Sequence, residues 1–163
     1  MPDNKFKISI SPVLENGLYK LVVQGKDKSN NSSAHQSYNI TFEVENKPTI
    51  THVMNYPNPF STSTRFVFTL TGSEIPEYFK IQVMTVTGKV IREINREELG
   101  PLHIGRNITS YAWDGTDEFG DRLANGVYLY RVITKLNGED IEARETDADH
   151  FFVNGWGKMY LLR

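Results

Sequence analysis

The densest group of chemistry-bearing side chains is the acidic, glycine-containing run at residues 114–121. Its carboxylates occupy the first, fourth, fifth and eighth positions, and Asp114, Asp117 and Asp121 are weak candidate calcium ligands. A calcium loop of the EF-hand type instead needs oxygen ligands at alternate positions and a bidentate glutamate at its end. We therefore predict no metal site: the aspartates cap two successive turns in which Gly115 and Gly120 take positive φ.

Catalytic patterns are also missing. The four histidines are scattered along the chain: His35, His52, His103 and His150. The sequence has neither the H-E-x-x-H spacing of zinc peptidases nor the G-x-S-x-G elbow of serine hydrolases. Asp147 and Asp149 beside His150 could form a base and its orienting partner, but a solvated acidic loop over residues 139–149 explains them more simply. We predict no catalytic residue and no cofactor for this fragment.

Charge and composition exclude several functional classes. The chain has 163 residues, with 18 Lys and Arg against 20 Asp and Glu, and no cysteine. Its isoelectric point of about 6.1 is far from the basic range of nucleic-acid-binding domains. No apolar run is long enough to span a membrane. The lack of cysteine excludes a disulfide scaffold, a zinc ribbon and a thiol nucleophile.

The elements that must position any site follow a period of two. Apolar and polar residues alternate in short runs bounded by Gly, Pro, Asn and Asp, a pattern typical of half-buried antiparallel strands. The expected strands are Phe6–Ile10, Tyr19–Val23, Tyr38–Val44, Thr49–Val53, Phe66–Leu70, Lys80–Val86, Val90–Ile94 and Val127–Ile133. We therefore predict an all-β fold, an immunoglobulin-like antiparallel β-sandwich.

Two local features refine this prediction. Thr87-Gly88-Lys89 is a turn signal that joins two strands into a hairpin, with Gly88 at positive φ. The segment Glu93–Leu99 has room for one helical turn, which Pro101 would limit. No segment of the chain shows a convincing helical period.

A domain boundary is expected at the polar stretch Glu45–Pro48. Residues 1–46 are too few for a sandwich of about 100 residues. We interpret them as the C-terminal strands of a truncated preceding immunoglobulin-like domain, or as a segment that donates strands to the second domain. Residues 47–163 then form one complete sandwich with an extended tail.

Two motifs of the second domain have a structural interpretation of their own. In Tyr56-Pro57-Asn58-Pro59-Phe60, Pro57 and Pro59 fix φ, so the chain enters the sandwich as a stiff lead between two aromatic anchors. Trp113 is expected in the core, where its indole N–H needs an acceptor.

Taken in order, the motifs of residues 53–133 form a larger pattern. They are Asn55-Tyr56-Pro57-Asn58-Pro59-Phe60, Thr64, Phe66–Leu70, Ile81–Val86, Gly88, Val90, Ile91, Trp113-Asp114-Gly115, Asp117, Gly120 and Asn125-Gly126-Val127-Tyr128-Leu129-Tyr130. This ordered set resembles the C-terminal sorting domain of the type IX (Por) secretion system of Gram-negative bacteria and the related immunoglobulin-like domain of the flagellar hook-capping protein. The ending Lys158–Arg163 resembles the short basic and apolar terminal strand of such sorting domains.

The resemblance implies a β-sandwich at the end of a larger exported protein that outer-membrane translocon components recognise. The predicted location is the cell surface or the medium, reached through the periplasm and outer membrane. Residues 137–157 form a longer excursion than the common sorting domains have, which places the chain nearer to the ends of large surface proteins such as gingipain-like cysteine peptidases. An enzyme would then lie upstream of this fragment.

A second interpretation is a glycan- or protein-binding accessory module of a surface hydrolase. Phe151, Phe152 and Trp156 lie in the excursion, where they could present aromatic rings to a ligand. The structural alternative is that these rings close the end of the sandwich or pack against the truncated first segment. A hook-capping role would need an upstream capping segment. The sequence favours a sorting and anchoring module whose defining residues are Pro57, Asn58, Pro59, Gly88, Trp113, Asp114, Gly115, Gly120, Gly126, Tyr128, Lys158 and Arg163.

Overall fold

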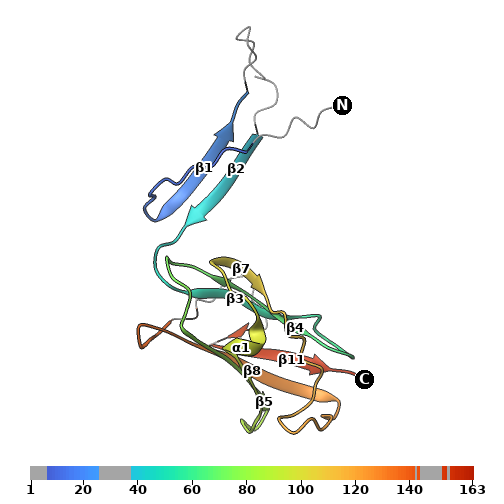
Figure 1. Ribbon diagram of the computed structural model, residues 1–163. Coiled ribbons are helices and arrows are strands. Elements are labelled where there is room, and N and C mark those ends of the chain that lie inside the picture. Colours follow the sequence, from blue (N-terminus) through green and yellow to red (C-terminus); the bar gives the residue numbers. More distant parts are fainter. Residues whose placement is uncertain (1–6, 26–37, 142, 144–151, 154) are drawn as a thin grey trace. The chain divides into compact units, whose positions relative to one another are not determined.

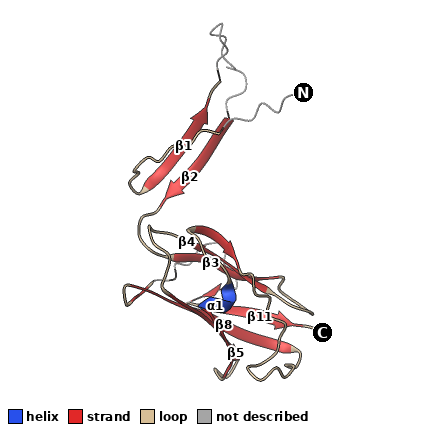
Figure 2. Cartoon of the chain, in the orientation of Figure 1, coloured by secondary structure: helices blue, strands red, loops and turns tan. Residues whose placement is uncertain are grey.

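The computed structural model describes residues 7–25, 38–141, 143, 152–153 and 155–163. The chain divides into two compact units, Met1–Asn46 and Lys47–Arg163, here called unit 1 and unit 2. In these described ranges, nearly all regular structure is antiparallel strand, and helix is confined to one short turn (Figure 2). The predicted all-β, sandwich-like fold is confirmed. Within the described ranges, no helix is long and apolar enough to cross a membrane.

Unit 1 is a two-stranded sheet. Its strands β1 (Gly17–Val23) and β2 (Tyr38–Val44) pair antiparallel over all seven residues of each strand (Figure 1). Tyr19 and Phe42 are opposite each other in the register, and their rings stack with centroids 5.9 Å apart. The unit therefore contains the second and third of the strands expected from the sequence.

The first expected strand, Phe6–Ile10, is wrong over its described part. Residues 7–16 have no strand assignment, and Ile8 and Ile10 are exposed; Phe6 lies outside the described residues. Alternation marks a strand only where a neighbouring strand supplies hydrogen bonds and a buried face. No described strand pairs with this segment. The Asn- and Ser-rich stretch 27–33, a composition typical of a turn, also lies outside the described residues.

Unit 2 is built from two antiparallel sheets. The elements are β3 (Ile50–Tyr56), β4 (Arg65–Leu70), β5 (Tyr78–Thr85), β6 (Val90–Asn95), α1 (Arg96–Leu99), β7 (Gly105–Ile108), β8 (Gly126–Leu136), β9 (Glu139–Asp140), β10 (Phe152–Val153) and β11 (Trp156–Leu161). The larger sheet has the order β10-β11-β8-β5-β6, with β9 pairing to β8, and the smaller has the order β3-β4-β7.

One hydrophobic core joins the two sheets. On β4 of the smaller sheet, Phe66 and Phe68 are fully buried. The ring of Phe66 lies 5.2 Å from that of Tyr130 on β8, and the ring of Phe68 lies 4.7 Å from that of Phe79 on β5. Aromatic pairs at these distances add to the stabilisation from burial alone. The alternation of β4 thus directs its large side chains onto the larger sheet.

The predicted hairpin and helical turn are both present. β5 and β6 pair antiparallel, and Gly88 in the turn between them has φ 85°. Helix α1 starts after Asn95, whose amide donates to the carboxylate of Glu98 at 3.0 Å in a capping box. It ends at Leu99, and its C-cap Gly100 directly precedes Pro101, the residue expected to limit it.

Candidate functional site

The C-terminal residues form an interior strand of the larger sheet. β11 pairs with β8 along its whole length, from Trp156 opposite Arg131 to Leu161 opposite Gly126. Met159 and Leu161 are fully buried. On its other side β11 pairs with the two-residue strand β10 only at its beginning. The terminal strand is therefore part of the core of unit 2.

Gly157 lets the terminal strand pack closely against β8. A Cβ atom built on this glycine would lie 2.0 Å from Cζ of the Tyr130 ring. Real Cβ atoms do not approach other atoms so closely, so the ring occupies the space of the missing side chain. An isolated glycine inside a strand pattern is a known sign of such a close approach. That signal could have identified this position from the sequence.

The proline-containing lead covers the remaining edge of the terminal strand. The Asn58 side chain accepts a hydrogen bond from the Tyr160 amide at 3.0 Å and donates one to the Lys158 carbonyl at 2.9 Å. The Phe60 amide donates to the Tyr160 carbonyl at 3.0 Å, and the Leu162 amide donates to the Phe60 carbonyl at 2.9 Å. A carboxamide offers the donor and acceptor of a peptide group. Asn58 thus stands in for a strand residue about 100 positions from its partners in sequence.

The last residue is held by a second group of contacts. The Arg163 amide donates to Oδ1 of Asn125 at 2.8 Å, and Nδ2 of Asn125 donates to the Arg163 carbonyl at 3.0 Å. The Arg163 guanidinium donates to the carbonyls of Asp114, Gly115 and Leu123. We call the residues that hold the terminal segment 158–163 in these two ways the tail clasp: residues 58–60, 114–115 and 123–125.

Gly115 and Gly126 fit the clasp in different ways. Gly115 has φ 75°, and a Cβ atom there would lie 2.8 Å from the Arg163 guanidinium and 3.1 Å from the Leu161 side chain. Both its conformation and its surroundings therefore require glycine. Gly126, the first residue of β8, has open space around its Cα.

An aromatic group lies beneath the clasp. Trp113 is fully buried, and its ring centroid lies 5.6 Å from that of Phe60 and 6.4 Å from that of Tyr128. The indole N–H donates to the Thr116 carbonyl at 2.9 Å, which supplies the acceptor expected from the sequence. The Tyr128 hydroxyl donates to the Ala124 carbonyl at 2.7 Å, and burial raises the pKa of this hydroxyl.

Of the two aromatic anchors predicted for the lead, only one is buried. Phe60 is 2% exposed, but Tyr56 is 71% exposed. The prediction that Tyr56 anchors the lead in the core is therefore wrong. Tyr56 ends β3 on the outward side, while the core side of that strand is taken by its neighbour Asn55. Pro57 and Pro59 are themselves exposed, and the Pro57 carbonyl accepts a hydrogen bond from the Thr64 hydroxyl at 2.8 Å.

The acidic run has the geometry of two capped turns. Oδ1 of Asp114 accepts from the amide and hydroxyl of Thr116, at 3.2 and 2.7 Å. Oδ1 of Asp117 accepts from the amides of Phe119 and Asp121, both at 2.9 Å. Gly120 has φ 87°, as a turn position favours. In the described part of the chain, no three His, Asp or Glu side chains group as a metal site would require.

Other predicted residues lie outside the clasp. Gly88 belongs to the β5–β6 turn, and Gly120 to the outer part of the acidic run. Lys158 has an exposed side chain whose ammonium lies 5.6 Å from the centre of the Tyr160 ring. His52 lies on β3 and His103 between α1 and β7. His35, Asp147, Asp149, His150 and Phe151 lie outside the described residues.

The aromatic excursion is only partly described. Trp156 is 38% exposed, and the Arg131 guanidinium lies 5.5 Å from the centre of its ring. One face of the indole is thus engaged by a cation of the same chain.

Sequence reasoning missed the contacts of Asn125 with the tail because Asn-Gly is most simply interpreted as a turn.

Comparisons with known proteins identify a likeness of fold. No protein-family model and no curated protein sequence matches the chain. The crystal structure of dimeric latent PorU from Porphyromonas gingivalis is similar to this chain, with a TM-score of 0.52 and 19% sequence identity. The similarity covers 93% of this chain and 13% of that one. At this level of identity, the fold of this chain is similar to that of a part of PorU.

Proposed function

We propose that the chain is a non-catalytic C-terminal sorting and anchoring module, which directs a larger exported protein through the type IX secretion system to the cell surface. The ordered motifs of residues 53–133 support this function. The fold likeness to PorU, a component of that system, supports the same context. The proposed partners are components of the outer-membrane translocon.

The tail clasp carries this proposal. It joins the Pro-Asn-Pro lead, the Trp-Asp-Gly turn and the terminal segment, three motifs far apart in sequence, through direct hydrogen bonds. Because Met159 and Leu161 point into the core, the alternation of a strand directs Lys158 and Tyr160 outward. Leu162 continues this row and is 55% exposed.

The clasp thereby turns a short tail into a rigid surface feature. Residues two apart on a strand are spaced by about 6.6 Å, so a cation, an aromatic ring and an apolar side chain stand in a fixed row. We infer that the translocon recognises this row on the folded sandwich. Strand addition to the covered edge of β11 would require Asn58 and Phe60 to leave first.

The experiment fuses residues 1–163 behind an exported reporter in a host with a type IX system and measures reporter at the cell surface. Deleting Lys158–Arg163 would remove two core residues, so it would test folding as much as recognition. Charge reversal of the exposed Lys158 together with Leu162→Ser keeps the core intact. We expect this double variant to lose surface delivery while remaining folded.

Lys89→Glu provides the matched control, because Lys89 is exposed in the β5–β6 turn, away from the clasp. It should be delivered like the unaltered chain. Normal delivery of the Lys158→Glu, Leu162→Ser variant would refute recognition of the tail row. Retention of the unaltered fusion inside the cell would refute the sorting function itself.

A further inference from the structure

The outer face of the smaller sheet carries a β-bulge at His52. Thr51 is opposite Thr69 and Met54 is opposite Val67, so two residues of β3 face one residue of β4 between these pairs. His52 has φ 52°, a left-handed conformation that a residue with a Cβ atom rarely adopts. Such a conformation costs about 1 kcal/mol or more. The bulge is therefore a strained feature of the fold.

The bulge changes which side chains face outward. Without it, alternation after Thr51 would direct His52 into the core. Instead His52 is exposed and the next residue, Val53, is 1% exposed in the core. The bulge thus places the imidazole on the outer face, and the residues of β3 after it still alternate between the core and the outer face.

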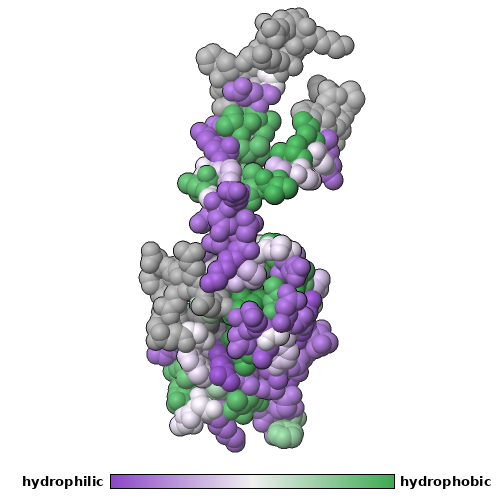
Figure 3. Space-filling view, turned by 90° about the vertical axis from the view of Figure 1, so that its left-hand side faces the viewer, coloured by the Kyte–Doolittle hydropathy of each residue, from purple (hydrophilic) through white to green (hydrophobic). Residues whose placement is uncertain are grey.

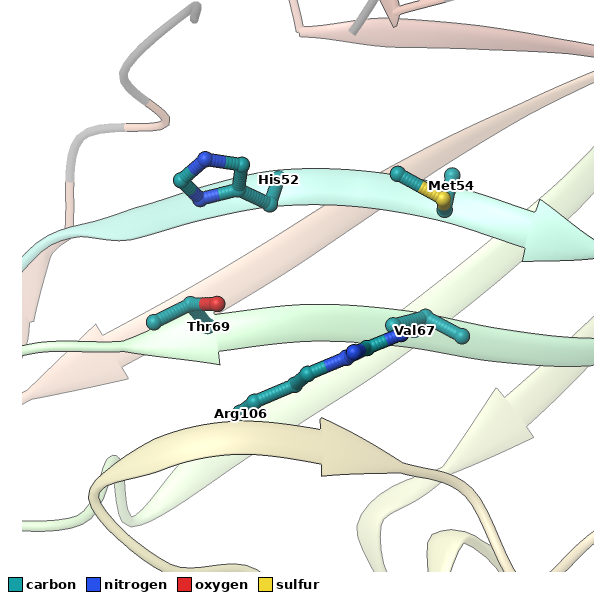
Figure 4. Close-up of a pocket in the computed structure, with 5 residues that line it drawn as sticks. All are labelled: His52, Met54, Val67, Thr69 and Arg106. Carbon is teal, nitrogen blue, oxygen red and sulfur yellow. The ribbon is translucent and has the colours of Figure 1, made fainter. Parts of the chain in front are cut away.

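A shallow cavity of about 370 Å³ lies beside this imidazole, lined by His52, Met54, Val67, Thr69 and Arg106 (Figure 4). Its floor is apolar: Val67 is 5% exposed although it faces outward, and Met54 is half-buried. Arg106 is opposite Thr69 in the β4–β7 register and extends along β4 toward Val67 (Figure 4). A cationic group and an apolar surface therefore share one hollow.

Each polar group of the cavity is able to donate a hydrogen bond. Among the described residues, no carboxylate forms an ion pair with Arg106. Nδ1 of His52 is 3.0 Å from the Thr51 hydroxyl. When that hydroxyl donates, the imidazole proton is on Nε2, which can then donate to an oxygen atom. Thr69 adds a hydroxyl at the same rim.

We propose that this cavity binds a carboxylate that carries an apolar group. The guanidinium of Arg106 takes the carboxylate, with His52 and Thr69 as further donors, and the apolar part lies on Met54 and Val67. A planar guanidinium matches a carboxylate in a bidentate geometry. The volume is near the lower end of small-molecule sites, about 300 Å³, and suits a short acyl chain or one acidic residue of a peptide beside an apolar one.

The test is a titration of the isotope-labelled full chain, followed by the amide resonances of His52, Val67 and Arg106. The probes are sodium hexanoate as the free acid, acetyl-Leu-Glu-Leu-amide as the peptide source, and hexanamide as the neutral match of the free acid. We expect saturable shifts with at least one of the two acids. Where hexanoate binds, hexanamide should bind at least about tenfold more weakly, because a hydrogen bond to a charged group is stronger than one to a neutral group. The probe that binds shows whether the carboxylate comes from a free acid or from a peptide.

Two variants locate the site. Arg106→Gln should weaken binding of the acid about tenfold, whereas Arg122→Gln, at an exposed arginine between β7 and β8, should leave it unchanged. His52→Gly removes the imidazole and suits the positive φ, so this variant folds and binds more weakly. Saturable binding of hexanamide as tight as that of hexanoate, full binding by Arg106→Gln, or no saturable shift with either acid would overturn the proposal.

Discussion

The two units of this chain treat the edges of their sheets differently, and unit 2 covers those of its larger sheet. Asn58 and Phe60 engage the side of β11 that β8 does not reach. At the opposite edge, the Glu118 amide donates to the Ile91 carbonyl at 3.0 Å, and its carboxylate accepts from the Glu93 amide at 3.1 Å. Covered edges do not recruit strands from other chains.

Unit 1 has one ladder and no comparable covering in its described residues. Apolar side chains of both strands are exposed, among them Leu18 at 75% and Tyr38 at 65%, and hydrophobic residues appear on the surface of this unit in Figure 3. At the end of the ladder near residues 16 and 46, the Asn46 amide donates to Oδ1 of Asn16 at 2.8 Å. A two-stranded sheet alone is marginally stable in water.

Similar alternation of apolar and polar residues therefore produces a core only where a second sheet is present to receive it. We therefore expect the two units to unfold separately, with unit 1 opening at lower free energy. Substitutions that break contacts between distant segments should matter in unit 2 and have little effect in unit 1.

The largest effect is expected for Gly157→Ala. The new methyl group would occupy the position of the Tyr130 ring, so β11 and β8 must separate or the ring must leave the core. We expect a loss of about 3 kcal/mol in the free energy of unfolding of unit 2, measured by urea denaturation with the fluorescence of the two tryptophans, Trp113 and Trp156, which both belong to this unit. Gly126→Ala is the control, because it adds the same methyl group to the paired strand in open space. Equal stability of the two variants would contradict the close packing of β11.

Asn58→Ala should have the next largest effect. It removes both side-chain hydrogen bonds to β11 and leaves the half-buried Tyr160 amide without an acceptor. We expect a loss of about 1–2 kcal/mol and faster amide hydrogen exchange at Tyr160. Asn16→Ala is the matched change in unit 1, where the lost bonds are exposed and water replaces them. If both variants lose the same stability, burial does not distinguish the two asparagines.

Local pattern predicted most strands of the fold, because alternation, turn glycines and the burial of Trp113 depend on near neighbours. The clasp required pairings across about 100 residues, such as Asn58 with Lys158, for which no local signal exists. The same gap explains two errors. Residues 7–10 alternate without a partner strand, and Tyr56 points outward although it borders the same lead as the buried Phe60.

Lowering the pH should weaken the contact of Glu93 with Lys80 in unit 2, with a smaller loss of stability than in the Asn58→Ala variant. Glu93 accepts hydrogen bonds from Lys80, at 2.8 Å, and from Gln82, and these bonds lower the pKa of its carboxyl group. Its stabilisation is therefore complete above the ordinary pKa of 4.5 and is lost as the pH falls through the lower value of the folded state. Because the side chains of Glu93 and Lys80 are both partly exposed, we expect the loss in free energy of unfolding to be less than about 1 kcal/mol.

Glu93→Gln should flatten this part of the pH profile, measured by urea unfolding at a series of acid pH values. Glu97→Gln, at an exposed carboxylate of α1, is the control and should keep the steeper profile. The same loss of stability on acidification in the Glu93→Gln chain would show that other carboxylates cause it.

The smallest effect is expected in unit 1, for Leu18→Ser. Three quarters of this side chain is exposed, so little apolar area returns to water and the free energy of unfolding should change by less than about 0.5 kcal/mol. Amide hydrogen exchange along the β1–β2 ladder measures it residue by residue. If protection of this ladder collapses as that of β11 does in Gly157→Ala, then Leu18 is buried in solution by a surface that the described residues do not contain. The contrast between the units would then reflect a missing partner for unit 1, because a covered apolar face stabilises a hairpin in the same way as it stabilises a sandwich.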